Sequence, residues 1–154
     1  MCVLSCPNNT YGHPLTFWCV DFCYGDYFAD PELNQCVTVC SPGLFADRGS
    51  SNKCVTRCNQ TGGYPFRDSD LRQCVSVCSN GYADPIAQSC VFNCTPGLYL
   101  NGSDQSNQTY RICAYNCTTP YFAYNNTQSG ICLQTCPEDP ILFGDTVAGL
   151  RICV

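Results

Sequence analysis

The chain has 154 residues and 17 cysteines, but Leu, Ile, Val and Phe together number only 33. That apolar content is close to the lower limit for a self-sufficient core, whereas the cysteine content is typical of a disulfide scaffold. A net charge of −5 with a single lysine argues against a nucleic-acid partner, and no apolar run is long enough for a membrane span. We therefore expect an extracellular, cell-surface protein in which disulfides replace much of the core.

A Cys-x3-Cys pair is repeated along the whole chain. Pairs begin at residues 2, 19, 36, 54, 74, 90, 113 and 132, and a ninth begins at Cys153. Such repeats predict one continuous array over residues 1–154, with about eight modules that each pack on their neighbours. Because Met1 runs directly into the first pair without a signal peptide, we expect a segment of a longer chain.

The stretches between pairs share one motif. It reads Gly-Asp-Tyr-Phe-Ala-Asp-Pro at 25–31, Pro-Gly-Leu-Phe-Ala-Asp at 42–47 and Asn-Gly-Tyr-Ala-Asp-Pro at 80–85. Gly and Pro favour a turn, the aromatic residues favour a strand, and Asp favours a second tight turn. The Val-rich pairs suit a second short strand. We predict a small, disulfide-rich, mostly irregular or β fold: an elongated rod of tandem single-disulfide β-hairpin modules with almost no helix.

The cysteine pairing is narrowed by geometry. In an extended Cys-x3-Cys segment the two Cα atoms are about 13 Å apart at ~3.3 Å per residue, and a disulfide requires less than about 7 Å. Bonding within a pair would need a helical turn, which β-branched residues disfavour. The alternative joins the second Cys of one pair to the first Cys of the next. It gives Cys6–Cys19, Cys23–Cys36, Cys40–Cys54, Cys58–Cys74, Cys78–Cys90, Cys94–Cys113, Cys117–Cys132 and Cys136–Cys153, and leaves Cys2 over.

The repeated pairs resemble those of a known kind of module. A valine follows the first Cys in six pairs, at Val3, Val20, Val37, Val55, Val75 and Val91. This pattern is similar to the single-disulfide modules of furin-like and growth-factor-receptor cysteine-rich regions, and to tandem cysteine-rich surface proteins of ciliates and other protists. The resemblance implies modules bonded in the second-to-next-first manner and stacked into a rod.

N-glycosylation motifs are more frequent than composition explains. Seven Asn-x-Ser/Thr motifs occur, where chance would supply about two. Two of them lie inside cysteine pairs, with Cys as the middle residue, which argues against the alternative that polar turns are simply rich in Asn, Ser and Thr. We predict N-linked glycans at Asn8, Asn59, Asn93, Asn101, Asn107, Asn116 and Asn125.

Catalytic and metal-binding residues are not predicted. His13 is the only histidine and is expected to be a loop residue. Zinc on the thiols conflicts with the oxidising setting. The repeated acids, which calcium would require, are read as turn formers; they are Asp30, Asp47, Asp84 and Asp145. A disulfide-stapled protease inhibitor is disfavoured because no loop recurs as a reactive site. No cofactor is expected.

Two functions remain open at this level. The first is an extracellular structural glycoprotein that forms the backbone of a surface filament, coat or appendage, with copies of itself or further repeats of the same chain as end-to-end partners. The alternative is a ligand- or host-binding surface antigen or receptor ectodomain, in which the repeats act as a rigid stalk. An enzyme is not expected.

Overall fold

The computed structural model describes residues 6–101, 111–118, 120–125, 130–138, 144–147 and 150–154. Within these residues there are 16 short strands and no helix, which confirms the predicted disulfide-rich fold of β-hairpin modules. The chain divides into two compact units, Met1–Ser76 and Val77–Val154. None of the described residues belongs to a helix with the length and apolar character needed to cross a membrane.

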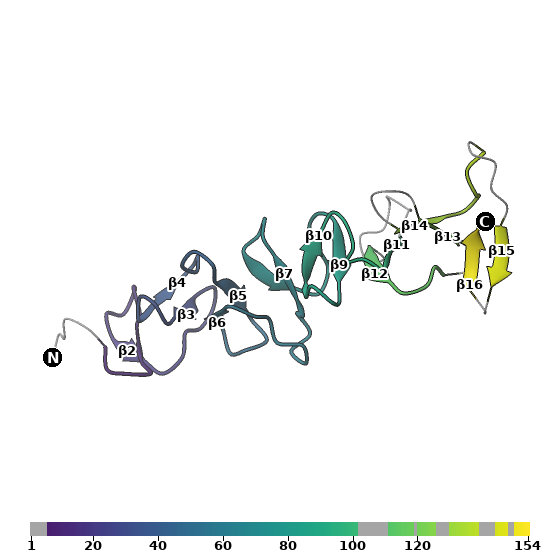
Figure 1. Ribbon diagram of the computed structural model, residues 1–154. Coiled ribbons are helices and arrows are strands. Elements are labelled where there is room, and N and C mark those ends of the chain that lie inside the picture. Colours follow the sequence, from purple (N-terminus) through teal and green to yellow (C-terminus); the bar gives the residue numbers. More distant parts are fainter. Residues whose placement is uncertain (1–5, 102–110, 119, 126–129, 139–143, 148–149) are drawn as a thin grey trace. The chain divides into compact units, whose positions relative to one another are not determined.

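Unit 1 holds four hairpins, each starting at the second Cys of one pair and ending just after the first Cys of the next (Figure 1). We number them as hairpins 1–4. Their strands are β1 (Tyr11–Gly12) with β2 (Cys19–Val20), β3 (Phe28–Asp30) with β4 (Gln35–Val37), β5 (Phe45–Asp47) with β6 (Lys53–Val55), and β7 (Phe66–Asp68) with β8 (Gln73–Val75).

Unit 2 repeats this construction in hairpins 5–8. Their strands are β9 (Tyr82–Asp84) with β10 (Ser89–Val91), β11 (Tyr99–Asn101) with β12 (Ile112–Ala114), β13 (Phe122–Asn125) with β14 (Gly130–Leu133), and β15 (Gly144–Val147) with β16 (Leu150–Cys153).

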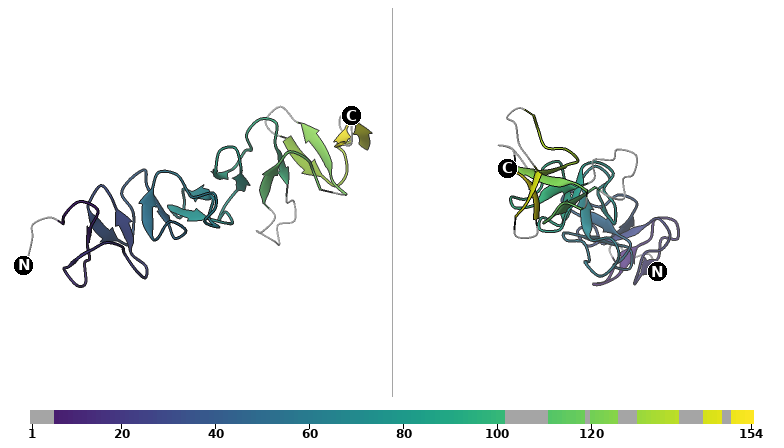
Figure 2. Two further views of the ribbon diagram at one scale, coloured as in Figure 1. Left: turned by 90° about the horizontal axis from the view of Figure 1, so that it is seen from below. Right: turned by 90° about the vertical axis from the view of Figure 1, so that its right-hand side faces the viewer.

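Each first strand pairs twice. It runs antiparallel to the second strand of its own hairpin and, except at the end of a unit, parallel to the second strand of the following hairpin. Ala29, for example, lies opposite Cys36 within hairpin 2 and opposite Lys53 of hairpin 3. The strand order is therefore β7-β8-β5-β6-β3-β4-β1-β2 in unit 1 and β15-β16-β13-β14-β11-β12-β9-β10 in unit 2. Within each unit the hairpins follow one another in chain order (Figure 2).

The Pro-Gly dipeptides form the turns that the sequence predicts. In hairpin 3, the Leu44 N–H donates to the Ser41 carbonyl at 3.0 Å across Pro42 and Gly43, and Gly43 has a φ of 84°. Hairpin 6 repeats this turn, with Leu98 donating to Thr95 at 3.0 Å. Proline fixes the first central residue and glycine accepts the positive φ, as this kind of turn requires.

The core is a series of small clusters instead of one large one. One cluster joins Phe28 of hairpin 2 to Leu44, Ala46 and the Cys40–Cys54 disulfide of hairpin 3. The central Ala of a first strand faces a half-cystine, as Ala46 faces Cys54, and Ala46 is buried. A small side chain leaves room for the disulfide there. Each hairpin thus completes its core with the next hairpin, as stacked repeats do.

Candidate functional site: the joints between hairpins

Eight disulfides close the hairpins, and each joins the second Cys of one pair to the first Cys of the next. Their Cα–Cα distances are 5.5–5.6 Å, which is ordinary disulfide geometry. The bonds are Cys6–Cys19, Cys23–Cys36, Cys40–Cys54, Cys58–Cys74, Cys78–Cys90, Cys94–Cys113, Cys117–Cys132 and Cys136–Cys153, the same pairs that the extended Cys-x3-Cys segments predict. Cys2 lies outside the described residues.

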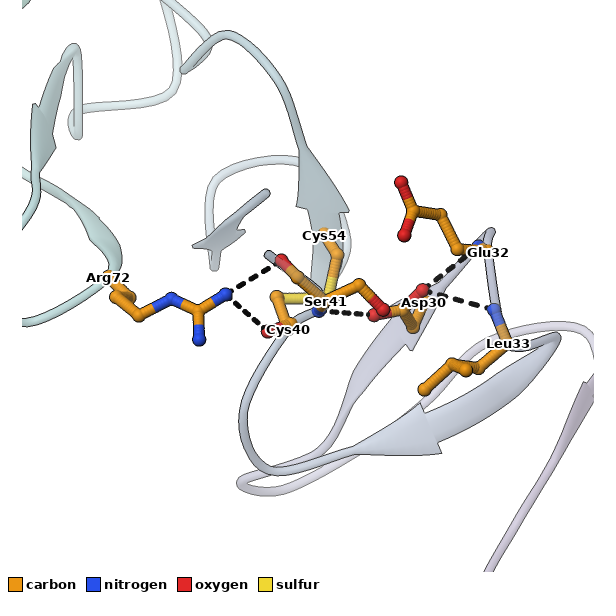
Figure 3. Close-up of a disulfide and its surroundings, with 7 residues drawn as sticks. All are labelled: Asp30, Glu32, Leu33, Cys40, Ser41, Cys54 and Arg72. Atoms are coloured by element: carbon orange, nitrogen blue, oxygen red, sulfur yellow. Dashed lines mark hydrogen bonds between the residues drawn. A yellow bond between two sulfur atoms is a disulfide. The ribbon is translucent and has the colours of Figure 1, made fainter. Parts of the chain in front are cut away.

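In hairpins 2, 3 and 5 a buried aspartate connects the hairpin to the next one. In hairpin 2, Asp30 ends the first strand and is fully buried. Its Oδ1 accepts the N–H groups of Glu32 at 2.9 Å and Leu33 at 3.2 Å, which fixes the hairpin's own turn (Figure 3). Its Oδ2 accepts the N–H of Ser41 at 2.7 Å, directly after the first Cys of hairpin 3 (Figure 3). We call this place in a hairpin the clamp position.

The clamp recurs in both units. Asp47 of hairpin 3 accepts the N–H of Gly49 at 2.8 Å through Oδ1, and the N–H of Asn59 in hairpin 4 at 3.3 Å through Oδ2. In hairpin 5, Asp84 Oδ2 accepts the N–H of Thr95 in hairpin 6 at 2.7 Å. Asp68, which the sequence reading passed over, is also buried at this position and accepts two amides of its own turn.

These hydrogen bonds favour the ionised form of the Asp30 and Asp84 carboxyls. Burial raises the pKa of Asp30, but the hydrogen bonds from Ser41, Glu32 and Leu33 together lower the pKa by more, so it lies below its usual 3.8. Burial likewise raises the pKa of Asp84, and its backbone and side-chain donors again outweigh that effect. An ionised carboxylate that accepts several backbone amides makes stronger hydrogen bonds than a neutral acceptor does.

A second bond of the joint comes from the residue just before the second strand. Asn34, Asn52, Arg72 and Gln88 hold this place, all with φ between 51° and 54°. The Asn52 carbonyl accepts the N–H of Ala29 at 2.8 Å, and the Arg72 carbonyl accepts the N–H of Ala46 at 3.0 Å. Asparagine is among the residues that adopt this left-handed conformation most readily.

Two side chains at this place also reach back to the preceding hairpin. Arg72 Nη2 of hairpin 4 donates to the carbonyls of Cys40 at 2.6 Å and Ser41 at 2.7 Å (Figure 3). Asn52 Nδ2 of hairpin 3 donates in the same way to the carbonyl of Gly25 at 3.2 Å. In hairpin 3, the carbonyls of Cys40 and Ser41 therefore accept hydrogen bonds from the following hairpin, while the N–H of Ser41 donates to the preceding one.

Three hairpins depart from the aspartate rule. In hairpin 1 the clamp position is held by His13, which is a loop residue as expected but is only 2% exposed. Its Nδ1 accepts the Leu15 N–H at 3.3 Å, as an aspartate would, and its ring stacks on Tyr24 at 4.8 Å. Its Nε2 has no hydrogen-bond partner among the described residues.

The other two departures lie in unit 2. Asn101 takes the clamp position of hairpin 6, because its neighbour Leu100 faces Cys113. In hairpin 7 the clamp position holds Tyr124, since Ala123 faces Cys132. The residue after the first Cys of hairpin 8 is Pro137, which has no N–H to donate. In hairpin 7 the acid is thus missing where the donor is missing, whereas Thr118, which follows the first Cys of hairpin 7, keeps its N–H although hairpin 6 has Asn101 at the clamp position.

The carboxylates of three acids of the repeated motif accept hydrogen bonds from backbone N–H groups. Asp30, Asp47 and Asp84 lie in separate hairpins, and backbone N–H groups fill their oxygens. Among the described residues there is no group of three or more His, Cys, Asp or Glu side chains that could hold a metal ion. Asp145, the fourth acid of the motif, is exposed.

Most predicted glycan acceptors lie at the surface. Five of the seven are exposed, namely Asn8, Asn59, Asn93, Asn116 and Asn125. Asn101 is half-buried at its clamp position. Asn107 lies outside the described residues.

The turn of hairpin 1 carries an apolar patch that the sequence did not single out. Leu15, Phe17 and Trp18 are 70%, 89% and 75% exposed. Phe17 has a φ of 58°, at the place where the other hairpins have Asn, Arg or Gln. Two backbone hydrogen bonds of 2.9 Å between His13 and residues 17 and 18 close the turn. A bulky aromatic residue in this conformation is unusual and suggests a function for the turn.

Comparison of the chain with protein-family models, curated proteins and solved structures finds no match. The class of protein is therefore defined by its construction: a tandem array of cysteine-rich, single-disulfide β-hairpins.

Proposed function

We propose that the chain is a non-enzymatic, extracellular structural glycoprotein that forms the backbone of a surface filament, coat or appendage. The observation that supports this most strongly is the repeated joint. Asp30, Asp47 and Asp84 each bond their own turn and the next hairpin, as Asp30 bonds Ser41 at 2.7 Å. A module whose buried carboxylate binds the neighbouring module is suited to a long array, because the same contact can join every added module.

The expected partners follow from the same construction. Copies of the chain, or further repeats of the same kind, would continue the array end to end through parallel strand pairing. Eight disulfides favour an oxidising compartment outside the cytoplasm. N-linked glycans on the exposed acceptors would keep the surface soluble. The proposal includes no cofactor, and the net charge of −5 leaves nucleic acid out of it.

Electron microscopy of the glycosylated protein, secreted from eukaryotic cells, tests the proposal. We expect regular fibrils or sheets whose repeat matches a whole number of hairpins. Isolated short particles at every concentration would contradict it. Enzymatic removal of N-glycans from the same sample should lower its mass, and an unchanged mass would remove the glycoprotein part of the proposal.

A second candidate, a surface antigen or receptor ectodomain that binds a ligand or host, is favoured by the apolar patch of hairpin 1. Residues 6–47 contain no lysine or arginine, and Asp21 is exposed, whereas the exposed Asp26 is already paired with Arg48. The partner would therefore offer an apolar pocket with a cationic rim. Phe17→Asn, which introduces the residue found at Asn34, should abolish adhesion to partner cells, whereas Val39→Ser should not. Equal adhesion of both variants and the unmodified protein would exclude this candidate.

A further inference from the structure

Two exposed aromatic side chains of unit 2 occupy equivalent places. Phe92 is 74% exposed and Tyr115 is 65% exposed. Each lies two residues after the first Cys of a pair, just past the end of β10 and β12. In five of the six other complete pairs the same place holds a polar residue, namely Asp21, Thr38, Thr56, Ser76 or Gln134. Two rings exposed at one place in a repeated module call for a function.

The next residue in both segments is a glycan acceptor. Asn93 and Asn116 are exposed, and each begins an Asn-Cys-Thr motif. No other complete pair has an asparagine at that place, so the aromatic residue and the acceptor occur together in the same two pairs. Both segments bend there instead of continuing as extended strands. The strand geometry that directs neighbouring side chains to opposite faces therefore does not apply to these two residues.

We propose that Asn93 and Asn116 carry N-linked glycans whose first sugars pack on the rings of Phe92 and Tyr115. The faces of an aromatic ring are electron-rich, and a sugar ring presents a face of weakly positive C–H groups. This packing would cover the apolar surface that both rings expose. The inference rests on the proposed glycoprotein and deepens it, because it names two acceptors and the surfaces that hold their glycans.

The attachment step fits the chemistry of the acceptor. A lipid-linked oligosaccharide diphosphate supplies the sugar: its C1–O bond breaks and a bond forms between C1 and Nδ2 of the asparagine. The lipid diphosphate leaves, and one amide proton is released. In the folded hairpin, Cys94 is bonded to Cys113 and the Thr95 N–H is held by Asp84 at 2.7 Å. The motif is then fixed, so attachment must precede closure of that disulfide.

The test begins with glycopeptide mapping of the protein secreted from eukaryotic cells. We expect occupied Asn93 and Asn116, and unoccupied sites would overturn the inference. Cys113→Ser, which keeps Cys94 from closing this disulfide, should raise any partial occupancy at Asn93 while leaving Asn59 unchanged. A fall in occupancy at Asn93 would contradict the required order.

Proton NMR of the glycosylated protein then tests the packing itself. Ring currents should shift the acetyl methyl resonance of each first sugar upfield, and Phe92→Ser and Tyr115→Ser should each abolish the shift at the adjacent glycan only. Phe22→Ser, which removes an exposed ring that no acceptor follows, should leave both resonances unchanged. Methyl positions unaffected by Phe92→Ser and Tyr115→Ser would overturn the inference. Fibrils that form without occupied sites would leave the structural proposal intact, so the two failures are distinguishable.

Discussion

Replacement of Asp30 by asparagine should remove the hydrogen bond to the next hairpin while keeping those to its own turn. Asparagine keeps an oxygen for the turn amides of Glu32 and Leu33, but it places an NH2 group against the N–H of Ser41, which the carboxylate accepts at 2.7 Å. The change removes a charge-assisted hydrogen bond and leaves a buried amide unsatisfied. The expected loss is about 2–4 kcal/mol for local opening of the joint.

Native-state hydrogen exchange measures this loss at the affected atom. The Ser41 amide of Asp30→Asn should exchange on the order of 30- to 700-fold faster than in the unmodified protein, since each 1.4 kcal/mol is tenfold. Asp26→Asn is the matched control, because Asp26 is exposed and makes only a surface ion pair with Arg48 at 3.0 Å. Equal Ser41 exchange in the two variants would refute the clamp.

Three further predictions concern the same joints. The lowered pKa of Asp30 and Asp84 means that the clamps stabilise the fold fully above about pH 3.8 and lose that contribution as the pH falls through the folded-state pKa. The Ser41 and Thr95 amides should therefore lose exchange protection in acid, after correction for intrinsic rates, and at a higher pH than the amides of the strand ladders. Simultaneous loss of protection at all these amides would be inconsistent with the clamp. Tyr124→Asp should lower the melting temperature, because it places a carboxylate at the clamp position of hairpin 7 while Pro137 of hairpin 8 has no N–H to donate to it. Pro137→Ser should restore the melting temperature in that variant only, and additive effects of the two substitutions would exclude a pairing of residues 124 and 137. Gly43→Ala should lower the free energy of unfolding by about 1–2 kcal/mol, because the residue has a positive φ. Gly81→Ala should lower it by more, because its Cβ would also clash with the Val91 carbonyl. Equal denaturation midpoints of the two variants would contradict this difference.

The sequence was sufficient for what each hairpin contains locally. The Pro-Gly turns, the aromatic-Ala-Asp strands and the order of the disulfides all follow from residues close together in the chain. The motif did not predict Asp68 as one of the repeated acids, because Arg67 takes the place of the alanine, although Phe66 and Asp68 keep the spacing. The Phe-x-Asp spacing was the available signal.

The hydrogen bonds between hairpins could not be predicted from the sequence alone. That Asp30 bonds Ser41 depends on the parallel pairing of β3 with β6, which brings together residues 11 apart in the chain. The burial of His13 depends on Tyr24 and Tyr27 of the next hairpin in the same way. The exposure of Phe17 could not be predicted from the sequence either, because phenylalanine is more often buried than exposed.

Non-reducing peptide mapping tests most directly the claim that each hairpin is closed by a bond from the second Cys of one pair to the first Cys of the next. Proteolysis without reduction should release fragments in which Cys40 is joined to Cys54 and Cys94 to Cys113, with the other pairs in the same order. A bond within one Cys-x3-Cys segment, such as Cys36 with Cys40, would contradict the account, because both strands of the hairpin and its joint depend on those two cysteines belonging to different loops.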